Sequence, residues 1–133
     1  MARFILYTDG AARGNPGPAA MGIVLTDAEG KEIEARSQVL GETTNNEAEY
    51  RALLWGLEWA RANRADELLI RTDSELLARQ LDGTYRVRAE NLKPLFEQAR
   101  TEIARFAQVS IHYIPREQNR RADALANAAL DKR

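Results

Sequence analysis

The order of hydrophobic patterns along the chain constrains its fold more than any other feature. Three segments with strand patterns come first, and helical and strand patterns alternate after them. The predicted strands span residues 3–8, 21–26, 31–40, 68–72 and 109–114, and the predicted helices span residues 45–63, 74–81, 92–106 and 119–131. A meander followed by crossover units predicts an α/β fold. Its mixed sheet would have an antiparallel half and two added parallel strands, flanked by helices.

The longest predicted helix has a clear start and a clear apolar face. Thr44, with Glu47 three residues later, has the spacing of a capping box. Leu53 belongs to one apolar stripe of this helix. Trp55 and Trp59 lie four residues apart on the neighbouring face, which favours packing in the core over stacking on nucleic-acid bases.

Length and composition fit one domain over residues 1–133. No apolar run reaches the roughly 20 residues of a membrane span, so no membrane partner is predicted. The sequence contains no cysteine, which excludes thiolate metal sites and indicates a cytoplasmic location. The net charge of −1 does not decide for or against a nucleic-acid partner, because a metal that neutralised some of the acidic residues would leave the protein with a positive net charge.

Four acidic residues interrupt the patterns around them: Asp9, Glu49, Asp73 and Asp123. Three of them have simpler interpretations, which stay open. Asp9 could belong to a turn, Asp73 could cap a helix, and Asp123 could lie on a solvated helix flank. Glu49 is harder to explain in this way, because it leads the apolar stripe of its helix and Glu47 already fills the capping role.

The predicted sheet would bring these carboxylates together. If the strand at residues 68–72 pairs in parallel with the strand at 3–8, Asp9 and Asp73 meet at one sheet edge. A carboxylate in apolar surroundings costs free energy unless a charge or a metal compensates it. Oxygen ligands suit Mg²⁺ or Mn²⁺, whereas zinc prefers His or Cys. Two ions about 3.5–4 Å apart would clamp a phosphodiester, one activating water and the other stabilising the leaving oxygen.

Four runs of sequence resemble the motifs of type 1 ribonuclease H in their order and spacing. One Thr-Asp-Ser alone would be weak evidence, but the four runs occur together and cover nearly the whole chain. They are Tyr7-Thr8-Asp9-Gly10 with Asn15-Pro16-Gly17, residues 43–49 (TTNNEAE), Thr72-Asp73-Ser74, and residues 119–126 (NRRADALA). The chain also resembles the short archaeal and bacterial subgroup that lacks a basic protrusion.

The resemblance implies a ribonuclease H-like fold and an endonuclease that hydrolyses the RNA strand of RNA–DNA hybrids, leaving 5′-phosphate and 3′-hydroxyl ends. The four acidic residues would be catalytic and would hold two Mg²⁺ or Mn²⁺ ions, and Arg116 would assist them. The implied substrate-binding residues are Asn15, Thr44, Asn45, Asn46, Glu75 and Asn91.

These implied substrate contacts differ in kind. Asn15 would lie in a loop that meets the minor groove, and Asn45 with Asn46 would read base edges and sugars there, as short amides can in an A-form groove. Helix capping is the alternative for this pair. Thr44 and Asn91 would form a pocket for a DNA-strand phosphate.

The sequence departs from the family pattern at several of these places. Glu75 stands where the family often has Gln, and Glu42 stands where it often adds an Arg to the phosphate pocket. Many members have a His in the loop before the last helix, where this chain has Arg116; His112 falls inside a predicted strand, so we expect a structural role for it. Arginine cannot shuttle protons near neutrality, so Arg116 would grip phosphate, or else be a solvated loop charge.

An RNA–DNA hybrid is therefore the predicted partner, with double-stranded RNA as a second candidate, and the chain is expected to be a monomer. The connection after residue 83 carries Arg86, Arg88 and Lys93 as its cations, which predicts modest hybrid affinity that falls steeply with salt. The main alternative is a non-catalytic domain of the same fold that binds hybrids or other nucleic acids. An integrase-like strand-transfer domain is a third hypothesis, which the asparagine pair at 45 and 46 disfavours.

Overall fold

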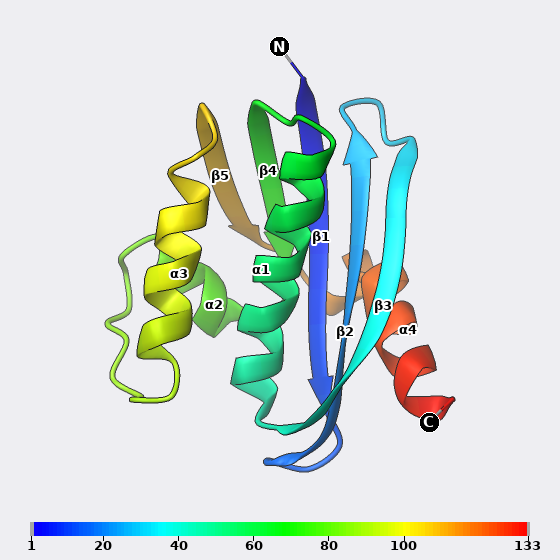
Figure 1. Ribbon diagram of the computed structural model, residues 1–133, viewed down its shortest axis with the longest axis vertical. Coiled ribbons are helices and arrows are strands. Elements are labelled where there is room, and N and C mark those ends of the chain that lie inside the picture. Colours follow the sequence, from blue (N-terminus) through cyan, green and yellow to red (C-terminus); the bar gives the residue numbers. More distant parts are fainter. Residues whose placement is uncertain (1, 133) are drawn as a thin grey trace.

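The strands form one five-stranded sheet in the order β3-β2-β1-β4-β5 in the computed structural model, which describes residues 2–132 (Figure 1). The end residues 1 and 133 of the predicted domain lie outside the described part. The strands are β1 (Arg3–Ala12), β2 (Gly17–Asp27), β3 (Glu32–Thr43), β4 (Glu67–Thr72) and β5 (Gln108–Tyr113). The pairs β1–β2 and β2–β3 are antiparallel, whereas β1–β4 and β4–β5 are parallel. The predicted mixed sheet is therefore confirmed.

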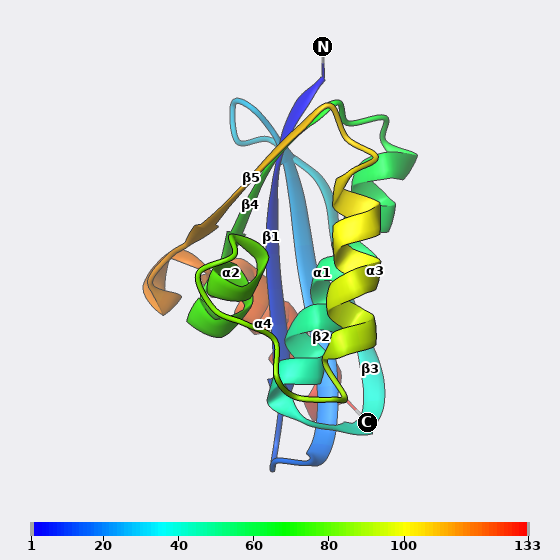
Figure 2. The same ribbon diagram turned by 90° about the vertical axis from the view of Figure 1, so that its left-hand side faces the viewer.

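Helices cover both faces of the sheet. They are α1 (Asn45–Ala62), α2 (Glu75–Leu81), α3 (Lys93–Ile103) and α4 (Arg120–Asp131), with a short 3-10 turn, η1, at Arg116–Gln118. Figures 1 and 2 show α1 and α3 on one face and α4 on the other, where α4 contacts β1, β2 and β3. Gly22 in β2 permits this approach, because a Cβ atom there would lie 2.4 Å from the carbonyl oxygen of Ala122.

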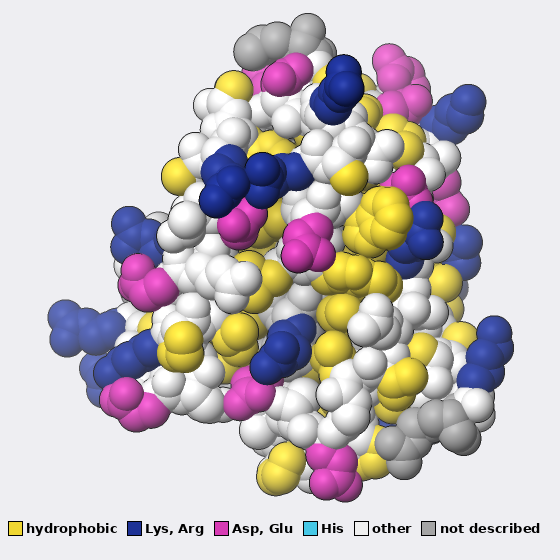
Figure 3. Space-filling view, viewed as in Figure 1, with side chains coloured by type: hydrophobic (Ala, Val, Ile, Leu, Met, Phe, Trp, Pro, Cys, Tyr) yellow, Lys and Arg dark blue, Asp and Glu magenta, His cyan; other side chains and the backbone are white. Residues whose placement is uncertain are grey.

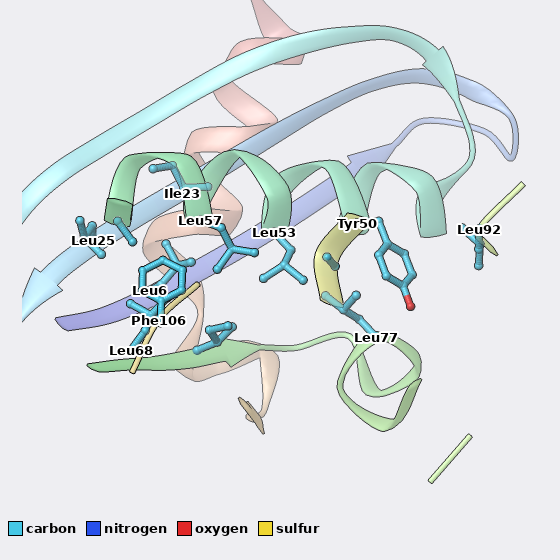
Figure 4. Close-up of a cluster of buried hydrophobic side chains, with 13 residues drawn as sticks. Leu6, Ile23, Leu25, Tyr50, Leu53, Leu57, Leu68, Leu77, Leu92 and Phe106 are labelled. Carbon is cyan, nitrogen blue, oxygen red and sulfur yellow. The ribbon is translucent and has the colours of Figure 1, made fainter. Parts of the chain in front are cut away.

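The main hydrophobic core lies between α1 and the sheet. Figure 4 shows Leu53 and Leu57 of α1 among the side chains of the strands, and both are fully buried. Burying one such leucine stabilises the fold by roughly 2 kcal/mol. Tyr50 is also buried, and its hydroxyl donates to Gln80 Oε1 over 2.5 Å, which links α1 to α2. The core thus holds the first turns of α1 against the sheet edge.

Several element boundaries differ from the prediction. Strand β1 continues past residue 8 to Ala12, which pairs with Ala19 of β2, so the turn interpretation of Asp9 is wrong. The apolar run ends at Thr8, but antiparallel pairing needs only backbone groups, and these continue. Strands β2 and β3 are also longer than predicted, and α3 ends at Ile103. The chain turns instead between β1 and β2, at residues 13–16.

The two tryptophans pack against the edge of the core. Trp55 and Trp59 are half-buried beside the buried cluster, and the guanidinium carbon of Arg36 lies 3.8 Å from the centroid of the Trp59 ring. The expected packing role is confirmed. Figure 3 shows acidic and basic side chains interspersed over the face formed by α1 and α3. Within residues 2–132, no helix combines the length and apolarity needed to cross a bilayer.

Candidate functional site

The end of β4 places Asp73 beside Asp9. The parallel register pairs Thr8 with Thr72, so the next residue of each chain segment lies at the same edge. Ser74 is the N-cap of α2, and its side chain accepts the backbone N–H of Leu77 over 3.2 Å. The capping interpretation of Asp73 is therefore wrong, and its carboxylate is left to face the site.

Glu49 reaches the same edge from α1. Parallel pairing of β1 with β4 ends at Thr8, and two residues later Gly10 donates its backbone N–H to Glu49 Oε1 over 2.9 Å. The helix comes so close here that a Cβ on residue 10 would lie 2.2 Å from the carbonyl carbon of Ala48. Glycine is thus required at this position for the carboxylate to reach the strand.

Asp9, Glu49 and Asp73 form a compact acidic group. Each offers one carboxylate oxygen, and the three oxygens lie within 4.8 Å of one another. Asp9 is 4% exposed and Glu49 is 5% exposed, whereas Asp73 is half-buried. The buried Oδ2 atom of Asp9 has no hydrogen-bond partner among the described residues. An orphaned carboxylate oxygen beside two further carboxylates fits a divalent metal site.

The electrostatics of this group support the same assignment. Burial, followed by the charges of Glu49 and Asp73, raises the pKa of Asp9 from 3.8 to about 9. Burial likewise raises the pKa of Glu49 to about 8, although the hydrogen bond from Gly10 opposes this shift. The pKa of Asp73 is also raised, mainly by burial. Three ionised carboxylates are thus unfavourable here unless a cation compensates them.

Asp123 lies at the rim of this group. It sits in the first turn of α4 and lines the same cavity of about 390 Å³, but it is not part of the three-residue cluster. Its Oδ1 atom accepts from Arg116 Nη2 over 3.4 Å and from Asn127 Nδ2 over 3.2 Å. Arg116 lines the cavity too. The flank interpretation of Asp123 is therefore wrong, because the side chain faces the acidic group.

Two of the predicted substrate-binding residues meet at the N-terminus of α1. Asn15 Oδ1 accepts the backbone N–H of Asn45 over 3.0 Å, and Asn45 lines the acidic cavity. Thr44 is the N-cap, and its hydroxyl accepts the backbone N–H of Glu47 over 3.2 Å. Neither Asn45 nor Asn46 is the cap, and both are exposed.

The remaining predicted residues lie farther from the acidic cavity or are engaged elsewhere. Glu75 is exposed and pairs with Arg79 over 3.7 Å, and it does not line the cavity. Asn91 donates from Nδ2 to Glu47 Oε1 over 2.7 Å. Only half of the predicted capping box therefore forms, because the Glu47 side chain turns away from the cap. His112 lies in β5, as predicted, with its side chain exposed.

The cavity also contains or adjoins residues to which the sequence assigned no role. Arg13 and Asn127 line it, and Arg13 Nη2 contacts Asp131 Oδ1 over 2.6 Å. Asn119 is 1% exposed and donates from Nδ2 to the carbonyl oxygen of Thr8 over 2.9 Å, which ties the start of α4 to β1. An asparagine directly before a helix is typical of an N-cap, so the sequence pattern does not indicate this contact with β1. The Asn119 side chain makes no capping hydrogen bond.

Comparison with known sequences gives a consistent result. A family model described as reverse transcriptase-like matches residues 7–129. The ribonuclease HI of Halobacterium salinarum is 44% identical over 125 residues, which cover 94% of this chain and 63% of that protein. The ribonuclease H of Halorhodospira halophila is 34% identical over 95% of this chain and 91% of that protein. The bifunctional protein Rv2228c of Mycobacterium tuberculosis is 38% identical, with 97% of this chain but 36% of that protein covered.

Solved structures agree with the sequence comparison. The crystal structure of RNase H1 from Halobacterium salinarum has a TM-score of 0.96 and 43% identity, covering 98% of this chain and 99% of that one. LC11-RNase H1 in complex with an RNA/DNA hybrid has a TM-score of 0.92 and 44% identity, with 97% of each chain covered. Sequence and topology agree over nearly the whole length, and the chain is a member of the ribonuclease H family.

Proposed function

We propose that this chain is an endonuclease that hydrolyses the RNA strand of RNA–DNA hybrids, with Mg²⁺ or Mn²⁺ as its cofactor and two ions in the site. The observation that carries the proposal is the buried group of Asp9, Glu49 and Asp73, with Asp123 at its rim. A protein that only bound nucleic acid would gain nothing from clustered carboxylates facing phosphate.

The relatives support the substrate. LC11-RNase H1 has been crystallised with an RNA/DNA hybrid, and this chain is similar to it over 97% of its length. The chain spans 63% of the length of the Halobacterium relative and 36% of the length of the mycobacterial one. The substrate, the 5′-phosphate and 3′-hydroxyl products, and the activity are accordingly proposals for this chain. A monomeric state, a cytoplasmic location and activity on double-stranded RNA stay predictions from the sequence.

Each acidic residue has a defined task in this mechanism. When bound, two divalent cations would supply an activated water and stabilise the leaving oxygen of the phosphodiester. Asp9 is held by strand pairing and Glu49 by the Gly10 N–H, so these two residues would provide rigid oxygen ligands. Asp73 at the end of β4 and Asp123 at the cavity rim would complete the ligand set from the more open side.

Neighbouring residues would position the substrate. From its place beside Asp123, the Arg116 guanidinium would attract a phosphate of the scissile strand and could bind two of its oxygens. Asn45 lines the cavity and its backbone N–H is bonded to Asn15 Oδ1, so both residues would lie beside a duplex bound at the carboxylates. These short side chains would contact the minor groove, where 2′-hydroxyls distinguish RNA from DNA.

A cleavage assay on one variant tests the proposal. Asp73→Asn preserves the shape of the side chain and leaves the Ser74 cap of α2 in place, so the fold should persist. We expect the unmodified chain to cut a labelled RNA–DNA hybrid with Mg²⁺ or Mn²⁺, and the variant to lose at least about 100-fold in rate. The same assay should include double-stranded RNA, single-stranded RNA and duplex DNA. Retained cleavage by a folded Asp73→Asn protein would exclude this mechanism, and hybrid binding without any cleavage by the unmodified chain would favour the non-catalytic alternative.

A further inference from the structure

The side chain of Glu47 occupies hydrogen-bond donors beside the N-terminus of α1. Asn91 Nδ2 donates to Glu47 Oε1 over 2.7 Å, and the Thr43 hydroxyl donates to Glu47 Oε2. Thr43 ends β3, and Asn91 precedes α3, so one carboxylate connects three segments of the chain. The backbone N–H of Glu47 is used separately, by the Thr44 cap.

These donors suit an anion. The first turn of a long helix carries a partial positive charge, and a neutral amide and a hydroxyl add two directed donors. Glutamate ordinarily carries a negative charge at neutral pH, and here its two carboxylate oxygens accept hydrogen bonds from Thr43 and Asn91. A phosphate oxygen accepts the same kinds of hydrogen bond as a carboxylate oxygen. The anion in this place is a side chain of the protein itself.

The N-terminal turn of α1 lies beside the acidic cavity. Asn45, two residues before Glu47, lines the acidic cavity, and its backbone is tied to the Asn15 loop. Under the proposed function, a duplex with one strand on the carboxylates would place its other strand near the N-terminal turn of α1. The phosphates of that second strand would pass close to Glu47 and Asn91.

We propose that Glu47 is an internal substitute for a phosphate of the DNA strand, and that it lowers the affinity of this chain for hybrid. The inference rests on the proposed function. A DNA phosphate would compete with the carboxylate for the donors of Asn91 and Thr43, and it would face a like charge while the carboxylate stays in place. Glu47 thus sets how tightly the second strand is held, while the acidic cavity acts on the first.

Binding measurements on a Glu47→Ala variant test this idea. Hybrid affinity would be measured in the Asp73→Asn background with Mg²⁺ at several salt concentrations, using a fluorescent RNA–DNA duplex. We expect Glu47→Ala to lower Kd about threefold or more at low salt. The slope of log affinity against log salt concentration should also become steeper by about one unit, because one more phosphate contact releases one more counterion. Glu47→Gln, which removes the charge and keeps the bulk, should give part of the same gain.

Two comparisons separate occupancy of the donors from a general charge effect. Glu58→Ala removes an exposed glutamate from the same helix and should leave Kd nearly unchanged. In an Asn91→Ala background, Glu47→Ala should increase hybrid affinity much less, because the Asn91 amide that would bind the phosphate is gone. Thermal unfolding checks that each variant is folded.

The inference is overturned if Glu47→Ala binds hybrid no more tightly than Glu58→Ala does. It is equally overturned if the gain is undiminished when Asn91 is absent. Failure of the unmodified chain to cut hybrid would count against the proposed function instead, and it is measured in a separate assay.

Discussion

Asp9→Asn should make the metal-free protein more stable. Burial and the neighbouring acids raise the pKa of Asp9 from 3.8 to about 9, so at pH 7 the folded protein keeps this group protonated while the unfolded chain ionises it. At about 1.4 kcal/mol for each pH unit, the interval from 3.8 to 7 corresponds to about 4 kcal/mol. The neighbouring acids share part of this cost, so we expect a gain of about 2–4 kcal/mol in the free energy of unfolding.

The pH dependence follows from the same shift. The folded state binds more protons than the unfolded state between about pH 4 and 9, so the stability of the unmodified protein falls as pH rises through this range. Asparagine does not titrate, so the advantage of the variant should grow from pH 5.5 to 8.5. Mg²⁺ should stabilise the unmodified protein, since it binds the folded state, and should stabilise the variant less.

Urea unfolding in EDTA at pH 5.5, 7 and 8.5 measures these differences. Asp82→Asn is the matched control, because Asp82 is an exposed acid whose pKa is lowered by Thr84, and its removal should not stabilise the protein. If Asp9→Asn is less stable than the unmodified protein in EDTA at pH 7, or if the difference does not grow with pH, the acidic group does not carry the electrostatic strain inferred for it.

Two further substitutions test the architecture of the site. Gly10→Ala should lower the free energy of unfolding in urea by about 3 kcal/mol or more, because its Cβ would lie 2.2 Å from a backbone atom of α1. Gly56→Ala is the control: its Cβ would meet only the movable end of Leu6 at 2.8 Å, so it should destabilise the protein clearly less. Equal losses of stability in the two variants would contradict this reasoning. Arg116→Ala should weaken hybrid binding in a filter or fluorescence assay, and it should reduce the slope of log affinity against log salt concentration by about 0.9. Arg116→Lys keeps the charge and should restore much of that slope. An unchanged slope in Arg116→Ala would show that the guanidinium makes no phosphate contact.

Local patterns predicted the elements of this fold well, because they depend on neighbouring residues. The Thr44 cap, the apolar stripe around Leu53 and the short apolar run of β4 are all present where the sequence indicates them. The error at the end of β1 has a local cause as well. Gly10 and the alanines after it carry little side-chain signal, and the hydrogen bonds that extend the strand come from β2.

The candidate site was only partly predictable. The parallel register that joins Asp9 to Asp73 follows from strand order, and Glu49 could be placed by its position on the helix. The roles of Arg13 and Asn119 could not be foreseen, because each contacts a segment more than 100 residues away in the sequence. A side chain before a helix has several possible partners, and only the packed structure selects among them.

The amino-acid sequence by itself determined which segments become strands and helices, and which acidic residues interrupt their apolar patterns. Those properties depend on the periodicity of side chains and on residues that cap or break an element. The tertiary structure alone decided that three acids share one buried space with Asp123 at its rim, and that Glu47 binds Asn91 instead of completing its cap. Distances of a few ångströms between side chains of different elements depend on register, helix placement and loop path, which no local pattern contains.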